Sequence, residues 1–364
     1  WVSKVNALQK LTFRLSAVQR GLDNSEPFAN CVDTFMSMLL RPVRDDQDHF
    51  LPNIIETERQ NLLMEYLAGS NDKSLYAADR AEALLSEDPS EWLNPLGTRE
   101  GLETADKTSL RDAWVRMLSA AGIRVYMYGS FDDCSLPDKV VHELASVPRG
   151  REALKLRPAR HPAVVKYPEM RDVTEYGDVE LAHLVMVFSG MPAYMSVAVL
   201  LGRILNYMLG ESQQSLLFME IRERLGYAYY VDSVYDSMAQ RITVTAEVDS
   251  AQAEESAAVI MEQIERLRKG DYPPELFKSA LKLYQNDLLQ VRDDLEDCLE
   301  FDSHECLGGG SLSSEEVLHF TTLAAEDYIQ KLAGRMKLRL KYLLLPESER
   351  PKTAEESKSG EVRL

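Results

Sequence analysis

Hydrophobic and polar residues follow the same order twice along this chain, in two segments about 230 residues apart. Each segment begins with alternating apolar and polar residues, at 11–17 and at 242–248, which predicts a strand. A polar turn and then an amphipathic stretch follow in both copies, at 26–40 and at 252–268, and its spacing predicts a helix with one apolar face. The order of elements therefore indicates an internal repeat.

Each copy continues through a turn that contains proline into a longer helical pattern, at 48–68 and at 274–298. Each copy then ends on a strand-like run, Ile123–Tyr128 in the first and Leu338–Leu345 in the second. We therefore expect an α+β fold of two repeated α/β domains, each with an antiparallel sheet packed by helices.

The second copy contains a region that the first copy lacks. About 64 residues precede the strand at 242–248 within the second half, against about ten before the strand at 11–17. This extra region predicts a strand at Leu181–Phe188, a helix at Met195–Leu209, a helix at Gln213–Arg224 and a tyrosine-rich strand. The first domain is therefore expected to lack its N-terminal portion.

Four segments follow from this organisation: a truncated first domain at 1–150, a linker at 151–178, a second domain at 179–346 and a disordered tail at 347–364. The linker region is rich in arginine, lysine and proline, so a basic binding strip is the alternative to a solvated connection.

The most informative stretch is 220–230, where a charged helix end is followed by Gly226 and then by the tyrosine-rich strand. Strand alternation predicts that Tyr229 faces the same way as Val231, opposite to Tyr230. Arg222 and Tyr229 are then candidates for one shared site. The alternatives are an exposed charge at a helix end for Arg222 and a core aromatic with its hydroxyl at the rim for Tyr229.

Charge and composition narrow the classes of partner. The chain has 364 residues, with 41 basic against 59 acidic side chains and a net charge of −18, which disfavours nucleic acids and anionic membranes as partners. No apolar run approaches the ~20 residues of a membrane span, and the first residues lack a signal-peptide pattern. We expect a cytoplasmic protein that binds peptides, small molecules or proteins. Because the chain begins with Trp1 rather than Met, we also expect that a segment was removed or omitted before it.

The positions of the histidines and cysteines do not indicate a metal site. Cys298, His304 and Cys306 lie close in sequence, but three ligands at mixed spacing favour unrelated residues over a structural zinc site, which usually takes four. The sequence therefore predicts no metal bound by this chain.

Three segments of the second half together resemble a known family: 209–212 (Leu-Gly-Glu-Ser), 217–223 (Leu-Phe-Met-Glu-Ile-Arg-Glu) and 226–229 (Gly-Tyr-Ala-Tyr). They resemble the glycine turn, Leu-Phe, Arg-Glu and Gly-Leu-Ala-Tyr sequence of the pitrilysin/insulinase family of zinc metallopeptidases. The likeness is greatest to the bacterial two-domain members and to the paired subunits of mitochondrial processing peptidase. In the first half, 55–65 resembles the helix that carries the third zinc ligand of catalytic members.

Catalytic members of that family bind zinc through His-x-x-Glu-His, and this sequence contains no such motif. The nearest string begins at His142-Glu143 and has Ser146 in place of the second histidine. The resemblance places the motif before Trp1. Glu58 and Glu65 remain either as relics of the zinc helix or as solvent-facing acids.

The resemblance implies a non-catalytic, substrate-binding subunit of a heterodimeric zinc metallopeptidase that processes peptides. In that reading Arg222 binds substrate and Tyr229 stabilises the oxyanion, both acting in trans on zinc held by a homologous partner subunit. Two alternatives stay open: a structural scaffold subunit with no hydrolytic role, and an active zinc peptidase whose His-x-x-Glu-His segment is missing from this chain. Further substrate contacts are assigned by resemblance to Gly210, Ser212, Phe218 and Tyr230.

Overall fold

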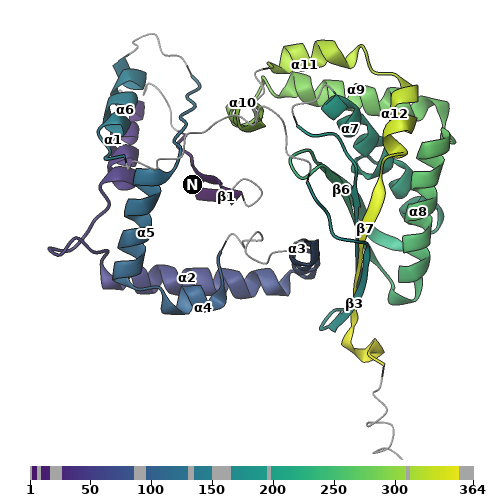
Figure 1. Ribbon diagram of the computed structural model, residues 1–364, viewed down its shortest axis with the longest axis horizontal. Helices are drawn as coiled ribbons and strands as arrows, with labels where there is room; N and C mark the ends of the chain where they lie inside the picture. Colours follow the sequence, from purple (N-terminus) through teal and green to yellow (C-terminus); the bar gives the residue numbers. More distant parts are fainter. Residues whose placement is uncertain are drawn as a thin grey trace, which may run out of the picture. The chain divides into compact units, whose positions relative to one another are not determined.

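The computed structural model describes residues 2–5, 10–16, 27–85, 96–129, 135–149, 165–194, 198–308 and 312–351. The chain divides into two compact units, each assembled from segments that are separated in sequence. Unit 1 comprises Trp1–Ala68, Leu93–Arg160 and Gln290–Ser311, and unit 2 comprises Gly69–Trp92, His161–Leu289 and Leu312–Leu364. Figure 1 shows the elements of both.

Unit 1 is mainly helical in its described part. Two short strands, β1 (Val2–Val5) and β2 (Lys10–Phe13), pair antiparallel. A small core joins α1 to α6 through Val32, Met36, Leu40 and Val140. The helices that belong to this unit, wholly or for the most part, are α1 (Pro27–Leu40), α2 (Pro52–Asn71), α4 (Arg99–Thr104), α5 (Lys107–Ala120), α6 (Ser135–Ala145) and α10 (Leu295–Gly308).

Two sequence predictions for unit 1 need correction. The predicted strand at Ile123–Tyr128 is wrong, because the backbone at 122–128 is irregular. A strand requires a neighbour for its backbone hydrogen bonds, and the strand pairing in the described part of unit 1 is that of β1 with β2, besides one isolated bridge between Arg44 and Phe50. The helix predicted at 48–68 begins later, at Pro52, since proline is favoured in the first turn of a helix.

Unit 2 is built on a five-stranded sheet in the order β3-β7-β4-β6-β5. Its central strand β4 is buried along its whole length, and the strands predicted at 181–188, 242–248 and 338–345 are confirmed to within two residues. β3 lies inside the predicted linker and runs parallel to β7, whereas the other pairs are antiparallel. The strands are β3 (Arg171–Gly177), β4 (Ala182–Ser189), β5 (Ala228–Asp236), β6 (Arg241–Val248) and β7 (Lys337–Pro346).

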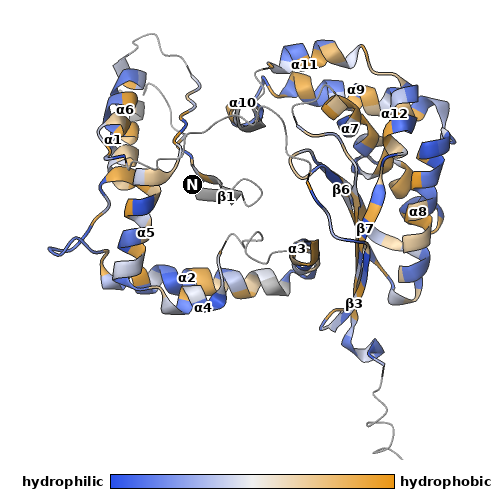
Figure 2. Ribbon diagram, in the orientation of Figure 1, coloured by the Kyte–Doolittle hydropathy of each residue, from blue (hydrophilic) through white to orange (hydrophobic). Residues whose placement is uncertain are grey.

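One face of this sheet is covered by a layer of helices. Alternate residues of β4 and β6, such as Leu184, Phe188 and Ile242, form the main core with the apolar faces of these helices. The helices carry both hydrophilic and hydrophobic residues in Figure 2, as amphipathic helices do. They are α7 (Ala198–Asn206), α8 (Ala253–Lys269), α9 (Pro274–Gln290), α11 (Ser314–Thr321) and α12 (Glu326–Ala333).

On the opposite face of the sheet, α3 (Lys73–Leu85) packs over β4 and β7. Ala77, Ala81 and Leu85 of this helix pack against apolar side chains of those two strands. An ion pair between Arg80 and Glu175, with a closest N–O distance of 2.7 Å, fixes the helix to β3. The α+β fold class predicted from the sequence is therefore confirmed, with helices on both faces of the larger sheet.

The single long helix predicted at 274–298 is two helices, α9 and α10. The side chain of Asp294 accepts a hydrogen bond from the backbone N–H of Glu296 at 2.6 Å, which starts the second helix in the manner of an N-cap. The predicted tail at 347–364 falls mostly outside the described residues, although 347–349 form a short 3₁₀ turn.

Candidate functional site

Arg222 stands on a π-helical segment, η3 (Phe218–Arg224), within the helix predicted at 213–224. Its guanidinium lies over the ring of Phe218, 4.9 Å from the centroid, so two predicted site residues are in contact. Arg222 is exposed and forms no ion pair with any described residue, whereas its neighbour Arg224 pairs with Glu220. The structure therefore presents Arg222 as a cation that is held in place but not neutralised.

The helix end behaves as predicted. Gly226 has a φ of +67°, a conformation that side-chain-bearing residues rarely adopt. The backbone N–H of Leu225 donates to Glu220 O at 3.0 Å, and that of Tyr227 donates to Ile221 O at 2.9 Å. These bonds close η3 and direct the chain into β5 directly afterwards.

A β-bulge lies at the start of β5. The register between β5 and β6 shifts between Ala228 and Tyr230, which makes Tyr229 the extra residue. Tyr229 is 66% exposed and Tyr230 is 47% exposed, so both leave the core. The predicted alternation is therefore wrong at one position: Val231 is buried, and Tyr229 does not share its face because the bulge re-aims it.

Gly210 lies in η2 (Tyr207–Glu211), the π-helical continuation of α7, and Ser212 follows directly after it. Gly210 is buried, and a Cβ at this position would lie 2.5 Å from Ser233 Oγ of β5. The hydroxyl of Ser212 donates to Tyr207 O at 3.0 Å. In this structure both residues serve the packing of η2, and their predicted contact with substrate stays a prediction.

Polar residues that the sequence analysis did not select surround these positions. The hydroxyl of Tyr230 donates to Asp232 Oδ2 at 3.1 Å, and partial burial raises the pKa of the Asp232 carboxyl above its ordinary value. Asn206, at the end of α7, bonds to both Glu211 and Ser233. The signal for Asn206 was present in the sequence as one amide among the apolar residues of 198–209.

The described residues provide no metal centre: they contain no group of three or more His, Cys, Asp or Glu side chains placed to hold an ion. The thiol of Cys298 donates to Val291 O at 2.9 Å, and the side chain of Cys306 lies outside the described part. Glu58 and Glu65 are exposed on α2. Zinc therefore has no fitting donor set in the described part of this chain.

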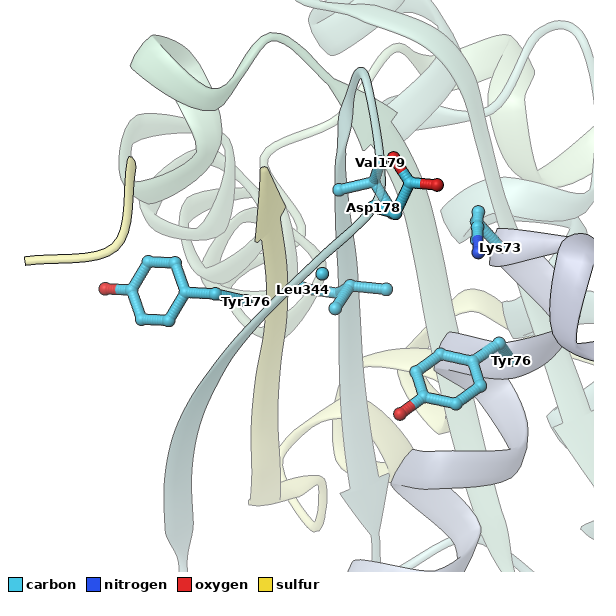
Figure 3. Close-up of a pocket in the computed structure, with 7 residues that line it drawn as sticks. Lys73, Tyr76, Tyr176, Asp178, Val179 and Leu344 are labelled. Carbon is cyan, nitrogen blue, oxygen red and sulfur yellow. The ribbon is translucent and has the colours of Figure 1, made fainter. Parts of the chain in front are cut away.

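A separate cavity of about 200 Å³ opens between α3 and the turn that joins β3 to β4 (Figure 3). It is smaller than most ligand pockets, which span roughly 300–1,000 Å³. None of the predicted site residues contributes to its walls, which are formed by Lys73, Tyr76, Tyr176, Gly177, Asp178, Val179 and Leu344. Among the described helices, none combines the length and apolar character needed to cross a bilayer.

Comparison with known proteins adds independent information. Residues 104–284 match the family described as the peptidase M16 inactive domain. A "Probable inactive metalloprotease" of Bacillus subtilis is 22% identical over 142 residues, which are 39% of this chain and 33% of that protein. The matched part thus spans about a third of that relative's length.

Solved structures share the fold. A conserved protein from Enterococcus faecalis aligns with a TM-score of 0.75 at 20% identity, covering 91% of this chain and 77% of the other. A peptidase M16 inactive domain from Pseudomonas fluorescens aligns with a TM-score of 0.66 at 13% identity, covering 89% and 76%. At these identities the likeness shows a common fold and no more.

Proposed function

The chain belongs to the pitrilysin/insulinase (M16) family and to its non-catalytic type, and on that premise we propose that it is the substrate-binding subunit of a heterodimeric zinc metallopeptidase that processes peptides. A homologous partner subunit holds the zinc, because the described residues of this chain offer no donor set for it. This chain supplies Arg222 and Tyr229 to the partner's active site.

The observation that carries the proposal is the β-bulge at Tyr229. A regular strand would place this tyrosine with Val231 against the core, where its hydroxyl has no access to substrate. The bulge instead exposes the side chain, and no described residue accepts a hydrogen bond from its hydroxyl. Such a free phenolic O–H is suited to donate to the oxyanion that forms when a peptide carbonyl is attacked.

Arg222 supports the same role. Its planar guanidinium offers several fixed donors for a peptide carbonyl or a terminal carboxylate. Stacking on Phe218 limits the freedom of the side chain without using those donors, so less entropy is lost when a peptide binds. Since η3 and β5 are neighbouring elements, Arg222 and Tyr229 belong to one region of unit 2.

Reconstitution with a zinc-bearing homologous subunit tests the proposal. Tyr229→Phe is expected to lower kcat for peptide cleavage by about 10²-fold, which is the usual cost of one oxyanion donor. Arg222→Ala is expected to raise KM, because it removes a contact to bound peptide. Tyr328→Phe and Arg224→Ala are matched controls, since both residues are exposed in the same unit.

The alternatives predict different outcomes of the same assay. A scaffold subunit would assemble with the partner, and both variants would then cleave peptide at the parent rate. An active peptidase whose His-x-x-Glu-His segment is missing from this chain would cleave peptide without any partner once that segment is present. Either result would overturn the in-trans role of Arg222 and Tyr229.

A further inference from the structure

The buried side-chain amide of Asn206 links α7 to β5, the strand that carries Tyr229 and Tyr230. We infer that Asn206 is a positioning residue, which sets the register of β5 and thereby holds Tyr229 and Tyr230 on the open side of the strand. This inference rests on the proposed function for its consequence in catalysis. The hydrogen bonds of Asn206 and the register of β5 do not depend on the proposed function.

The side chain of Asn206 forms three of its four possible hydrogen bonds at this junction. Its Nδ2 donates to Ser233 O at 2.9 Å and to Glu211 Oε2 at 2.7 Å, and its Oδ1 accepts from Ser233 Oγ at 2.8 Å. The residue is only 1% exposed, so water offers no substitute for any of these bonds. Losing the amide leaves the buried carbonyl and hydroxyl of Ser233 on β5 without these partners.

These bonds exist in only one register of β5. Ser233 faces α7 in the observed pairing, opposite Val244 of β6. A slip of one residue would turn Ser233 away and bring Asp232 toward the core, because strand side chains alternate with a period of two. The contact between Asn206 and Ser233 therefore selects the observed register.

The register matters most at the bulge, where the ladder itself is interrupted. Only a few residues separate Tyr229 from the anchored Ser233, and without the extra residue Tyr229 would turn inward. Gly210 allows η2 to pack closely against Ser233, since even a Cβ at this position would lie 2.8 Å from Ser233 N. The hydrogen bonds from Asn206 on α7 thus hold β5 in place next to the point where the bulge interrupts its pairing with β6.

Fluorine NMR on the full chain, labelled with 3-fluorotyrosine, tests this positioning without any partner. The signals of Tyr229 and Tyr230 are assigned by Tyr229→Phe and Tyr230→Phe. Asn206→Ala is expected to shift or broaden both signals, and Ser233→Ala, which removes only the hydroxyl bond, to do so less. Ser233→Ala also keeps the inference testable if Asn206→Ala does not fold.

The control is Leu276→Ala, a buried truncation on α9 that loses stability without touching this network. Unchanged tyrosine signals in folded Asn206→Ala or in Ser233→Ala, or equal changes in Leu276→Ala, would overturn the inference. In an active complex, Asn206→Ala is expected to lower kcat by about 10- to 100-fold while KM changes less than about twofold. An inactive parent complex would refute the proposed function and leave the NMR result standing.

Discussion

Close packing against Ser233, rather than a turn that requires a positive φ, explains the glycine at position 210. An added Cβ would lie within 3 Å of three atoms of Ser233, one of them in the backbone, so β5 or η2 would have to move. We expect Gly210→Ala to lower the free energy of unfolding by about 1–3 kcal/mol, as overpacking does. Urea denaturation with a two-state fit gives this value.

Gly69 provides the matched control for Gly210. It lies in α2 with no atom within 4 Å of its added Cβ, so Gly69→Ala is expected to raise the stability by up to about 1 kcal/mol through helix propensity. If the two substitutions change stability in the same direction, close packing at Gly210 is not the reason for its glycine.

At the same scale, the sequence predicted the elements that carry the candidate residues better than the packing around them. The helix predicted at 213–224 contains both Phe218 and Arg222, and these two side chains are in contact. The bulge at Tyr229 left no trace in the hydrophobic pattern, because an extra residue between two tyrosines looks like ordinary alternation. Asn206 was visible only as a polar exception, and its partner Ser233 depends on tertiary packing.

Among the elements, α3 covers a face of the sheet through small residues. Ala81 is buried against β4 and β7, where an aspartate would place a charge with no partner. We expect Ala81→Asp to destabilise unit 2 by about 3 kcal/mol or more. Leu75→Asp on the same helix is the control, since Leu75 is exposed and an acid is favourable in the first turn.

Hydrogen exchange locates the effect of these two variants. Ala81→Asp is expected to reduce protection along α3 and in the part of the sheet that it covers. A loss of protection of the same size in Leu75→Asp would contradict the packing role of this helix.

The first turn of α3 also makes the docking of the helix sensitive to pH. His183 of β4 is buried beneath it, with Nδ1 3.4 Å from Ser74 Oγ and 3.9 Å from Glu247 Oε1. Burial lowers the pKa of His183 below its ordinary value, and Lys73 adds to this, whereas Glu247 and Asp72 act in the opposite direction. The unfolded chain therefore binds more protons than the native chain just below pH 6.5, so stability falls as the pH drops through this window.

Replacing His183 is expected to remove that contribution. His183→Asn should show a smaller loss of unfolding free energy between pH 7 and pH 5 than the parent, measured by urea denaturation at each pH. The exposed His319 serves as control, and His319→Asn should follow the parent. Equal slopes for His183→Asn and the parent would rule out the buried histidine as a source of the pH dependence.

The bounds of an element were predicted best where its hydrophobic pattern was regular. β6 and α8 alternate or repeat cleanly and were predicted to within a residue or so. β3 was missed because its residues are mixed in polarity and follow a basic, proline-containing stretch. The run at 123–128 has the pattern of a strand, but a strand forms only where a neighbouring strand can pair with it, and the segment's own pattern does not show that.

For the whole molecule, the sequence predicted a repeat but not the grouping of the elements into the two units. α3 lies in the first half of the sequence and packs in unit 2, and α10 follows α9 directly but belongs to unit 1. Long-range packing of this kind depends on which apolar faces meet, and a one-dimensional pattern carries no record of that.

The described residues contain no donor set for zinc, which leads to a prediction for the full chain. A ligand that binds only the native state raises stability by about 2.7 kcal/mol at 100 times its Kd, so a resident zinc ion would raise the melting temperature clearly. We expect the purified chain to melt at the same temperature with zinc or with a chelator. The described residues offer only pairs such as His183 and Glu247, which are too few for a site.

The complex with a zinc-bearing subunit should behave differently, with peptide cleavage lost in chelator and restored by zinc. The comparison separates the two halves of the proposed assembly, since metal would then act on the partner and not on this chain. A zinc-dependent rise in the melting temperature of the chain alone would show that it carries its own metal site. Peptide cleavage by that zinc-loaded chain would favour the active-peptidase alternative over an in-trans role for Arg222 and Tyr229.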